Sequence, residues 1–112
     1  MKHYTRTLPL FLFISFAFAQ TQLGSDIDGE AAGDGSGASV SMNAAGDRVA
    51  IGATVNDGTG YGAGHVRVYE YSNSSWTQLG SDIDGEAADD RSGMPVSMNS
   101  AGDRVAIGAD RN

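Results

Sequence analysis

The sequence predicts an all-β fold made of repeated units, and three observations support this prediction. One segment occurs twice, 56 residues apart: residues 21–53 and 77–109 are identical at 28 of 33 aligned positions. Within each copy, short stretches alternate apolar and polar residues and show no helical periodicity. Glycine makes up 16 of the 112 residues, which suits short strands joined by tight turns. A tandem repeat of this length favours an array of β units over a unique catalytic core.

Four strands are predicted in the one complete unit: Ser39–Asn43, Arg48–Ala53, His65–Tyr71 and Trp76–Ile83. The first alternates, with Val40 and Met42 on one face. The second carries Ala50 and Gly52 on one face, which is therefore nearly flat and lets another sheet come close. The third alternates β-branched and aromatic residues, and the fourth is weakened near its end by Gly80.

Polar or glycine-rich turns separate these strands, at Ala44–Asp47, Thr54–Gly64, Ser72–Ser75 and Asp84–Gly93. Partial units flank the complete one. Thr21–Ile27 matches a fourth strand, and Pro95–Asn99 and Arg104–Ala109 match a first and a second strand. Four antiparallel strands per tandem unit are typical of a β-propeller blade. A β-helix and a β-sandwich are the alternatives, although β-helix turns are usually shorter and a sandwich needs no near-identical halves.

The first residues are predicted to be a secretory signal peptide, spanning 1–19. Lys2, His3 and Arg6 form a basic start, and the apolar run Leu8–Ala19 ends in small residues suited to cleavage before Gln20. A transmembrane anchor is the alternative, but a span needs ~20 apolar residues and this run is shorter. We therefore expect a secreted protein whose repeat region is 20–112.

Composition narrows the classes of partner. Removal of Lys2 and Arg6 changes the formal charge from −7 to −9, because five arginines then face 14 acidic residues and no lysine remains. Phosphate neutralisation needs basic groups, so we expect no nucleic acid partner and no membrane association after signal cleavage. The chain has no cysteine, so its stability must come from packing.

The repeat resembles a known family. The pattern GxSVSMNxxGDRVAIGA, followed by a glycine-rich loop, GHVRVYEY and WTQLG, resembles FG-GAP repeats, the blades of integrin α-type β-propellers. It is similar in particular to a bacterial secreted subtype with WxQLGxDIDGE and VAIGA signatures, and the likeness covers Thr21–Asn112. The resemblance implies a propeller of about seven blades used for extracellular interaction or adhesion. On this basis, residues 20–112 hold one complete blade with partial flanking blades of a larger propeller.

The sequence departs from the family at its calcium loop. Integrin-like blades often hold calcium in an Asp-x-Asp-x-Asp-Gly loop, but here the equivalent turns are Asn43–Asp47 and Asn99–Asp103. Each offers one carboxylate and one amide, too few oxygen ligands for a cation that takes six to eight. The aromatic residue of the Phe-Gly pair is also replaced, at Ser36 and Ser92, and the proline of Gly-Ala-Pro is replaced by Thr54 and Asp110.

Other polar clusters are interpreted as structural. The two acidic motifs are Asp26-Ile27-Asp28-Gly29-Glu30 with Asp34, and Asp82-Ile83-Asp84-Gly85-Glu86 with Asp89 and Asp90. Their glycine spacing does not fit a calcium loop, and aspartates that cap turns explain them better. His65 has no visible nucleophile or metal partner, and no Gly-x-Ser-x-Gly elbow is present. Tyr69, Tyr71 and Trp76 are expected to pack across strands rather than to form a sugar-stacking platform.

These observations predict no catalytic, cofactor-binding or metal-binding residues. We expect a non-catalytic secreted module for extracellular interaction or adhesion, with an unknown protein or glycan partner. Two alternatives stay open: accessory blades of a larger secreted hydrolase, and a truncated product without independent function. Bare sheet faces and strand edges also predict that the isolated repeat region can self-associate.

Overall fold

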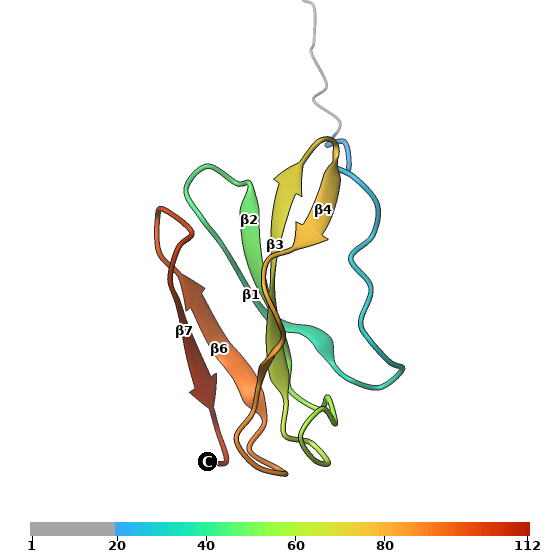
Figure 1. Cartoon of the computed structure of the whole chain (residues 1–112), viewed down its shortest axis with the longest axis vertical. Coiled ribbons are helices and arrows are strands. Elements are labelled where there is room, and N and C mark those ends of the chain that lie inside the picture. Colours follow the sequence, from blue (N-terminus) through green and yellow to red (C-terminus); the bar gives the residue numbers. More distant parts are fainter. Residues whose placement is uncertain (1–19) are drawn as a thin grey trace, which may run out of the picture.

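The computed structural model describes residues 20–112, which form two antiparallel β-sheets without any helix (Figure 1). The all-β prediction is therefore confirmed for this part of the chain. The seven strands are β1 (Ser36–Met42), β2 (Arg48–Ala53), β3 (His65–Ser72), β4 (Ser75–Gln78), β5 (Ile83–Asp84), β6 (Ser92–Met98) and β7 (Val105–Ala109). Within 20–112, no helix is long and apolar enough to cross a membrane. The predicted signal peptide lies outside the described residues.

The first sheet has the strand order β1-β2-β3-β4, with β5 also paired to β3. The predicted fourth strand, Trp76–Ile83, is therefore only partly right, because the structure divides it into β4 and β5. Gly80 adopts a φ of +70° at the break, a conformation that costs glycine little. Both pieces nevertheless pair antiparallel with β3, through Tyr71↔Trp76 and Val66↔Ile83.

The second sheet is the hairpin of β6 and β7, which repeats the hairpin of β1 and β2. Both hairpins have a register irregularity near the start of the first strand, and corresponding residues pair: Val40 with Ile51, and Val96 with Ile107. The repetition in the sequence is thus also a repetition of backbone structure.

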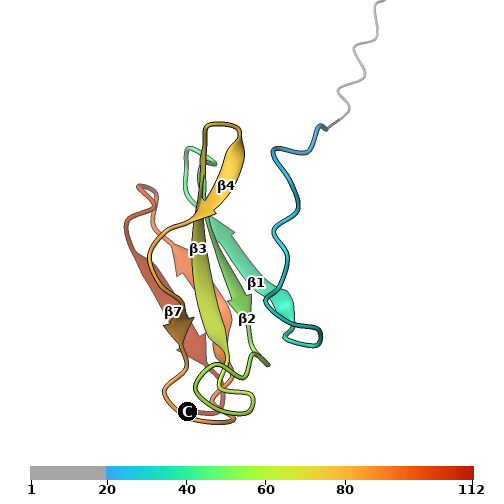
Figure 2. The same ribbon diagram turned by 45° about the vertical axis from the view of Figure 1, so that its right-hand side comes forward.

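The segment Thr21–Ile27 forms no strand, so its assignment as a fourth strand is wrong. Within residues 20–112 no third strand of its own unit precedes it, and a strand without a partner has no ladder of hydrogen bonds. Figure 2 shows this segment as an irregular chain beside the first sheet. Leu23 accepts a hydrogen bond of 2.9 Å from the indole nitrogen of Trp76, which holds the segment there.

The core lies between the two sheets. Its buried residues are Ala50, Val66, Val96 and Met98, with Val68, Val105 and Ile107 packed around them. The flat face predicted for β2 is what admits the second sheet. A Cβ atom added to Gly52 would lie only 2.0 Å from the carbonyl oxygen of Gly93, so β2 and β6 approach closely at this point.

Hydroxyl groups of β1 tie the two sheets together. Ser39 and Ser41 accept hydrogen bonds from the backbone N–H groups of Val96 and Met98, at 3.0 and 2.9 Å. The face of β1 that meets the second sheet is therefore its serine face, and the apolar face points away. Without these acceptors, two backbone donors of β6 would lose their partners at the interface.

Corresponding residues of the two units differ sharply in burial. Val40 is 60 % exposed, whereas its equivalent Val96 is 7 % exposed. The alanine pair shows the opposite distribution: Ala50 of the first unit is 0 % exposed, whereas its equivalent Ala106 of the second unit is exposed. One face of the first unit thus packs against the opposite face of the second. Within residues 20–112, the other two faces, one on each unit, have no sheet packed against them.

Candidate functional site

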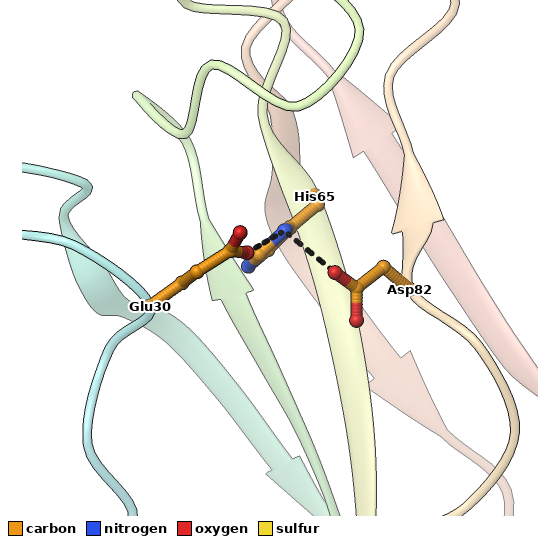
Figure 3. A group of neighbouring side chains, drawn as sticks. All are labelled: Glu30, His65 and Asp82. Carbon is orange, nitrogen blue, oxygen red and sulfur yellow. Dashed lines mark ion pairs between the residues drawn. The ribbon is translucent and has the colours of Figure 1, made fainter.

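The most unusual polar group in residues 20–112 is the side chain of His65, at the start of β3. The residue is 3 % exposed, and its Nδ1 atom is buried without a hydrogen-bond partner among the described residues. Three carboxylates surround that atom: Asp82 Oδ2 at 3.7 Å, Glu30 Oε2 at 3.8 Å and Asp84 Oδ1 at 3.9 Å. Figure 3 shows Glu30 and Asp82 approaching the imidazole ring from opposite sides.

Three separate parts of the chain place these groups. Glu30 lies in the irregular segment before β1, and His65 pairs with Ala53 of β2. Asp82 precedes β5 and Asp84 ends it, on the other side of β3. The glycine after Asp84 fixes the approach, since a Cβ atom added to Gly85 would lie 2.0 Å from the Ala63 carbonyl oxygen. Only a residue without a side chain lets this strand come so close to the loop before β3.

Arg67 partly neutralises the cluster. It lies two residues after His65, on the same face of β3, and binds Asp82 with two hydrogen bonds of 2.7 and 2.8 Å. The same guanidinium donates to Glu30 Oε2 at 2.7 Å, and Gln78 donates to Asp82 at 2.7 Å. The hydrogen bonds from Arg67 are the main reason that the pKa of Asp82 falls to about 2, and Asp82 in turn raises the pKa of Arg67.

The charges around His65 do not balance. Glu30, Asp82 and Asp84 contribute three formal negative charges and Arg67 contributes one positive charge, which leaves a formal charge of −2 on the side chains around the imidazole. A cavity of about 10 Å³ lined by Glu30, His65 and Arg67 adjoins the cluster. A space of about this size accommodates a single water or small ion. The arrangement is suited to holding a positive charge.

The same geometry gives no sign of nucleophilic catalysis. No serine or threonine hydroxyl of residues 20–112 forms a hydrogen bond with His65 Nδ1, so the pairing that activates a serine is absent there. The expectation of a non-catalytic chain stays a prediction.

The sequence shows no partner for His65, but the structure brings three carboxylates within 3.9 Å of its Nδ1 atom. Its neighbours are 35 residues before it and 17 to 19 residues after it, so no local motif reveals them. The available signal was the repeat itself. Glu30 closes the first Asp-Ile-Asp-Gly-Glu motif, and Asp82 and Asp84 open the second, so the two copies meet on either side of one histidine.

Other members of the acidic motifs do cap turns. Asp34 accepts a hydrogen bond of 3.1 Å from the backbone of Ala31, and the equivalent Asp90 accepts one of 3.0 Å from Ala87. Asp34 is 6 % exposed and also accepts a hydrogen bond from the Asn56 amide at 2.8 Å. The cap interpretation holds for these two aspartates.

The Asn43–Asp47 and Asn99–Asp103 turns are closed by their own side chains. The amide of Asn43 donates to the Asp47 carboxylate at 2.7 Å, and its oxygen accepts hydrogen bonds from the backbone of Asp47 and Arg48. Asn99 makes the same contacts with Asp103 and Arg104. The absence of calcium from these turns remains a prediction.

The aromatic residues pack as the strand pairing predicts. The rings of Tyr71 and Trp76 face each other across β3 and β4, with centroids 5.2 Å apart and planes tilted by 55°. This geometry is a favourable aromatic contact. It accounts for these two rings without a carbohydrate ligand.

Comparison with known proteins finds no matching family model, and neither a curated protein nor a solved structure matches the chain.

Proposed function

We propose that the chain is a non-catalytic secreted repeat module, of the FG-GAP-like propeller type, that serves in extracellular interaction or adhesion. The observation that supports this proposal most is the way the two units pack. The face of the first unit that carries Ala50 covers the face of the second that carries Val96. Because this contact joins two different faces, it can be repeated from unit to unit.

The unpaired faces have the composition that such repetition requires. The first unit presents Val40 at 60 % and Met42 at 50 % exposure, and their equivalents Val96 and Met98 are the residues buried at the existing interface. The second unit presents Ala106 where the first unit buries Ala50. Exposed apolar surface of this kind marks an interaction site in a soluble protein.

The N-terminal segment, residues 20–35, lies beside the unpaired face of the first unit. A groove lined by Leu23, Ile27, Met42 and Ile51 separates this segment from β1 and β2. In a longer array, another unit would take this position. Four-stranded blades and ring closure belong to this proposal and rest on the resemblance of the repeat sequence to FG-GAP repeats.

The proposal can be tested by adding copies of the 56-residue unit to the chain. If the units stack as blades, each added unit contributes one new interface, and the free energy of unfolding rises with each copy. The extended chain should then bind one or more members of a panel of extracellular proteins and glycans in surface plasmon resonance. Turnover of panel members by the chain itself, or stability that does not change with added units, would contradict the proposal.

Two alternatives give different results. If the chain provides accessory blades of a secreted hydrolase, the reading frame encodes a catalytic domain beyond Asn112. If the chain is a truncated product, the added copies restore stability but the natural chain binds no member of the panel.

A further inference from the structure

The −2 charge and the unpartnered Nδ1 atom of His65 point to a ligand that the proposed function does not include. We propose that His65, Glu30 and Asp82 bind one divalent cation of the Zn²⁺ class, with Asp84 as a further oxygen donor. Three properties of the cluster favour such a cation: the direction of the imidazole, the type of ligand atoms and the distances between them.

His65 Nδ1 is buried and faces three carboxylate oxygens at 3.7 to 3.9 Å, too far for hydrogen bonds. In the tautomer with the proton on Nε2, the Nδ1 lone pair points at these carboxylates, which is electrostatically unfavourable. A cation between them converts that repulsion into coordination. Burial of an unsatisfied polar atom is costly, so an occupant is favoured.

The ligand atoms select the class of metal. One imidazole nitrogen with two or three carboxylate oxygens is a set that Zn²⁺ and related transition metals accept. Calcium and magnesium prefer oxygen ligands alone, and the histidine disfavours both. The site therefore differs in position and chemistry from the Asn43–Asp47 turn, which replaces the family's calcium loop.

The distances allow coordination after a small closure. One ligand atom each from Glu30, His65 and Asp82 lie within 4.8 Å of one another. Ligand atoms of a tetrahedral zinc site are ~3.3 Å apart, given metal–ligand bonds of ~2.0 to 2.1 Å. Closing a separation of up to 4.8 Å to this value takes movements of up to ~1.5 Å, and the side chains of Glu30 and Asp84, which are 48 % and 36 % exposed, have room for them.

Arg67 positions the carboxylate ligands and does not displace the metal from them. It binds Asp82 through both oxygens and Glu30 through Oε2, and so holds two metal ligands in place from the side of β3. Asp82 Oδ2, the oxygen nearest His65 Nδ1, accepts only one hydrogen bond and keeps a second lone pair free for the metal. Outer hydrogen-bond partners of this kind are usual around ligating groups. Titratable groups at or beside the cluster are Glu30, Asp82, Asp84, Arg67, Asp28 and Tyr69.

The bound cation would join three segments that are distant in sequence. Glu30 belongs to the irregular segment before β1, His65 to β3 and Asp82 to the chain before β5. We expect metal binding to hold the N-terminal segment against the first sheet. Because one ligand comes from the first copy of the acidic motif and another from the second, each junction between two such units can form one site.

The test uses isothermal titration calorimetry with Zn²⁺ on the full chain, freed of metal with a chelator. A His3→Ala background removes the only other histidine. We expect one Zn²⁺ per chain with micromolar affinity. Glu30→Gln should weaken binding at least ~10-fold, because it removes a charged ligand. The matched control is Glu86→Gln, at the equivalent exposed position of the second motif, which should leave the affinity within twofold.

A second measurement keeps the test independent of folding defects. In ¹⁵N-labelled protein, ligation should shift the Nδ1 resonance of His65 on addition of Zn²⁺, while Glu30→Gln retains the circular dichroism spectrum of the unmodified chain. The proposal is overturned if no Zn²⁺ binds, or if Glu86→Gln weakens binding as much as Glu30→Gln. It is also overturned if Nδ1 carries a proton that Zn²⁺ does not displace.

Discussion

Replacing Val96 with alanine tests the packing of the two units, because the chain contains a matched control at Val40. Both valines lie in the same Val-Ser-Met-Asn sequence, at equivalent positions of β6 and β1. Val96 is 7 % exposed in the core between the sheets, whereas Val40 is 60 % exposed. Any difference in the effect of the two substitutions therefore reports burial between the units.

The magnitude follows from the methyl groups removed. Val96→Ala deletes two buried methyl groups at ~0.8 kcal/mol each, and the cavity that remains raises the loss to about 2 kcal/mol. Less than half of Val40 is covered, so Val40→Ala should cost under about 0.6 kcal/mol. For a domain of this size, the difference corresponds to about 8 °C in the melting temperature.

The assay is urea unfolding followed by far-UV circular dichroism, at protein concentrations low enough to prevent association. The denaturant dependence of the free energy of unfolding should be the same for both variants, because unfolding exposes the same surface. Equal losses of stability, or a larger loss for Val40→Ala, would refute the packing of the second unit on the first.

Three further predictions concern the interface and the charge cluster. Ser41→Ala should destabilise the chain by about 1 to 2 kcal/mol, because the backbone N–H of Met98 loses its acceptor. Ser97→Ala, at the equivalent exposed position of the second unit, should change the stability by less than about 0.5 kcal/mol. Urea unfolding of the two variants measures this difference. Gly52→Ala should cost about 2 to 3 kcal/mol by thermal melting, since the new methyl group would lie 2.0 Å from a backbone oxygen of β6, and an unchanged melting temperature would refute the close approach. Folding lowers the pKa of Asp82 from 3.8 to about 2, so ionised Asp82 stabilises the folded chain fully at pH values above 3.8. This stabilisation is lost as the pH falls toward 2. Because the Asp82 side chain is 28 % exposed, the unmodified chain should lose about 1 to 2 kcal/mol more stability than Asp82→Asn over this pH range. If the free energies of unfolding of the two proteins fall in parallel with pH, the ion pair is contradicted.

Local sequence patterns predicted the two central strands of the first sheet closely, whereas β1 and β6 each begin three residues before their predicted starts. The bounds predicted for Arg48–Ala53 are the bounds of β2, and β3 extends only one residue beyond the predicted Tyr71. Alternation and glycine-rich turns determine these elements, and both are visible within a few residues. The prediction failed at Thr21–Ile27, because similarity to a strand does not supply the neighbouring strand that it needs.

The cluster around His65 could not be predicted in the same way. Its charged groups come from segments up to 54 residues apart, from Glu30 to Asp84, and only the folded sheet brings them together. The packing of one unit on the other was easier to predict from the sequence. The small residues of β2 indicated a close approach by another sheet, and the structure places Gly93 of β6 against Gly52.

The most direct test of unit stacking is sedimentation of two complementary variants. Val40→Asp blocks the bare face of the first unit and Ala106→Asp blocks that of the second, and both residues are exposed, so each variant should fold. We predict that the unmodified repeat region forms oligomers whose mass rises with concentration, and that each variant alone is a monomer. An equimolar mixture should form a 1:1 heterodimer, because each variant retains the face that the other lacks. A monomeric unmodified protein, or a mixture that stays monomeric, would contradict the stacking of unit on unit.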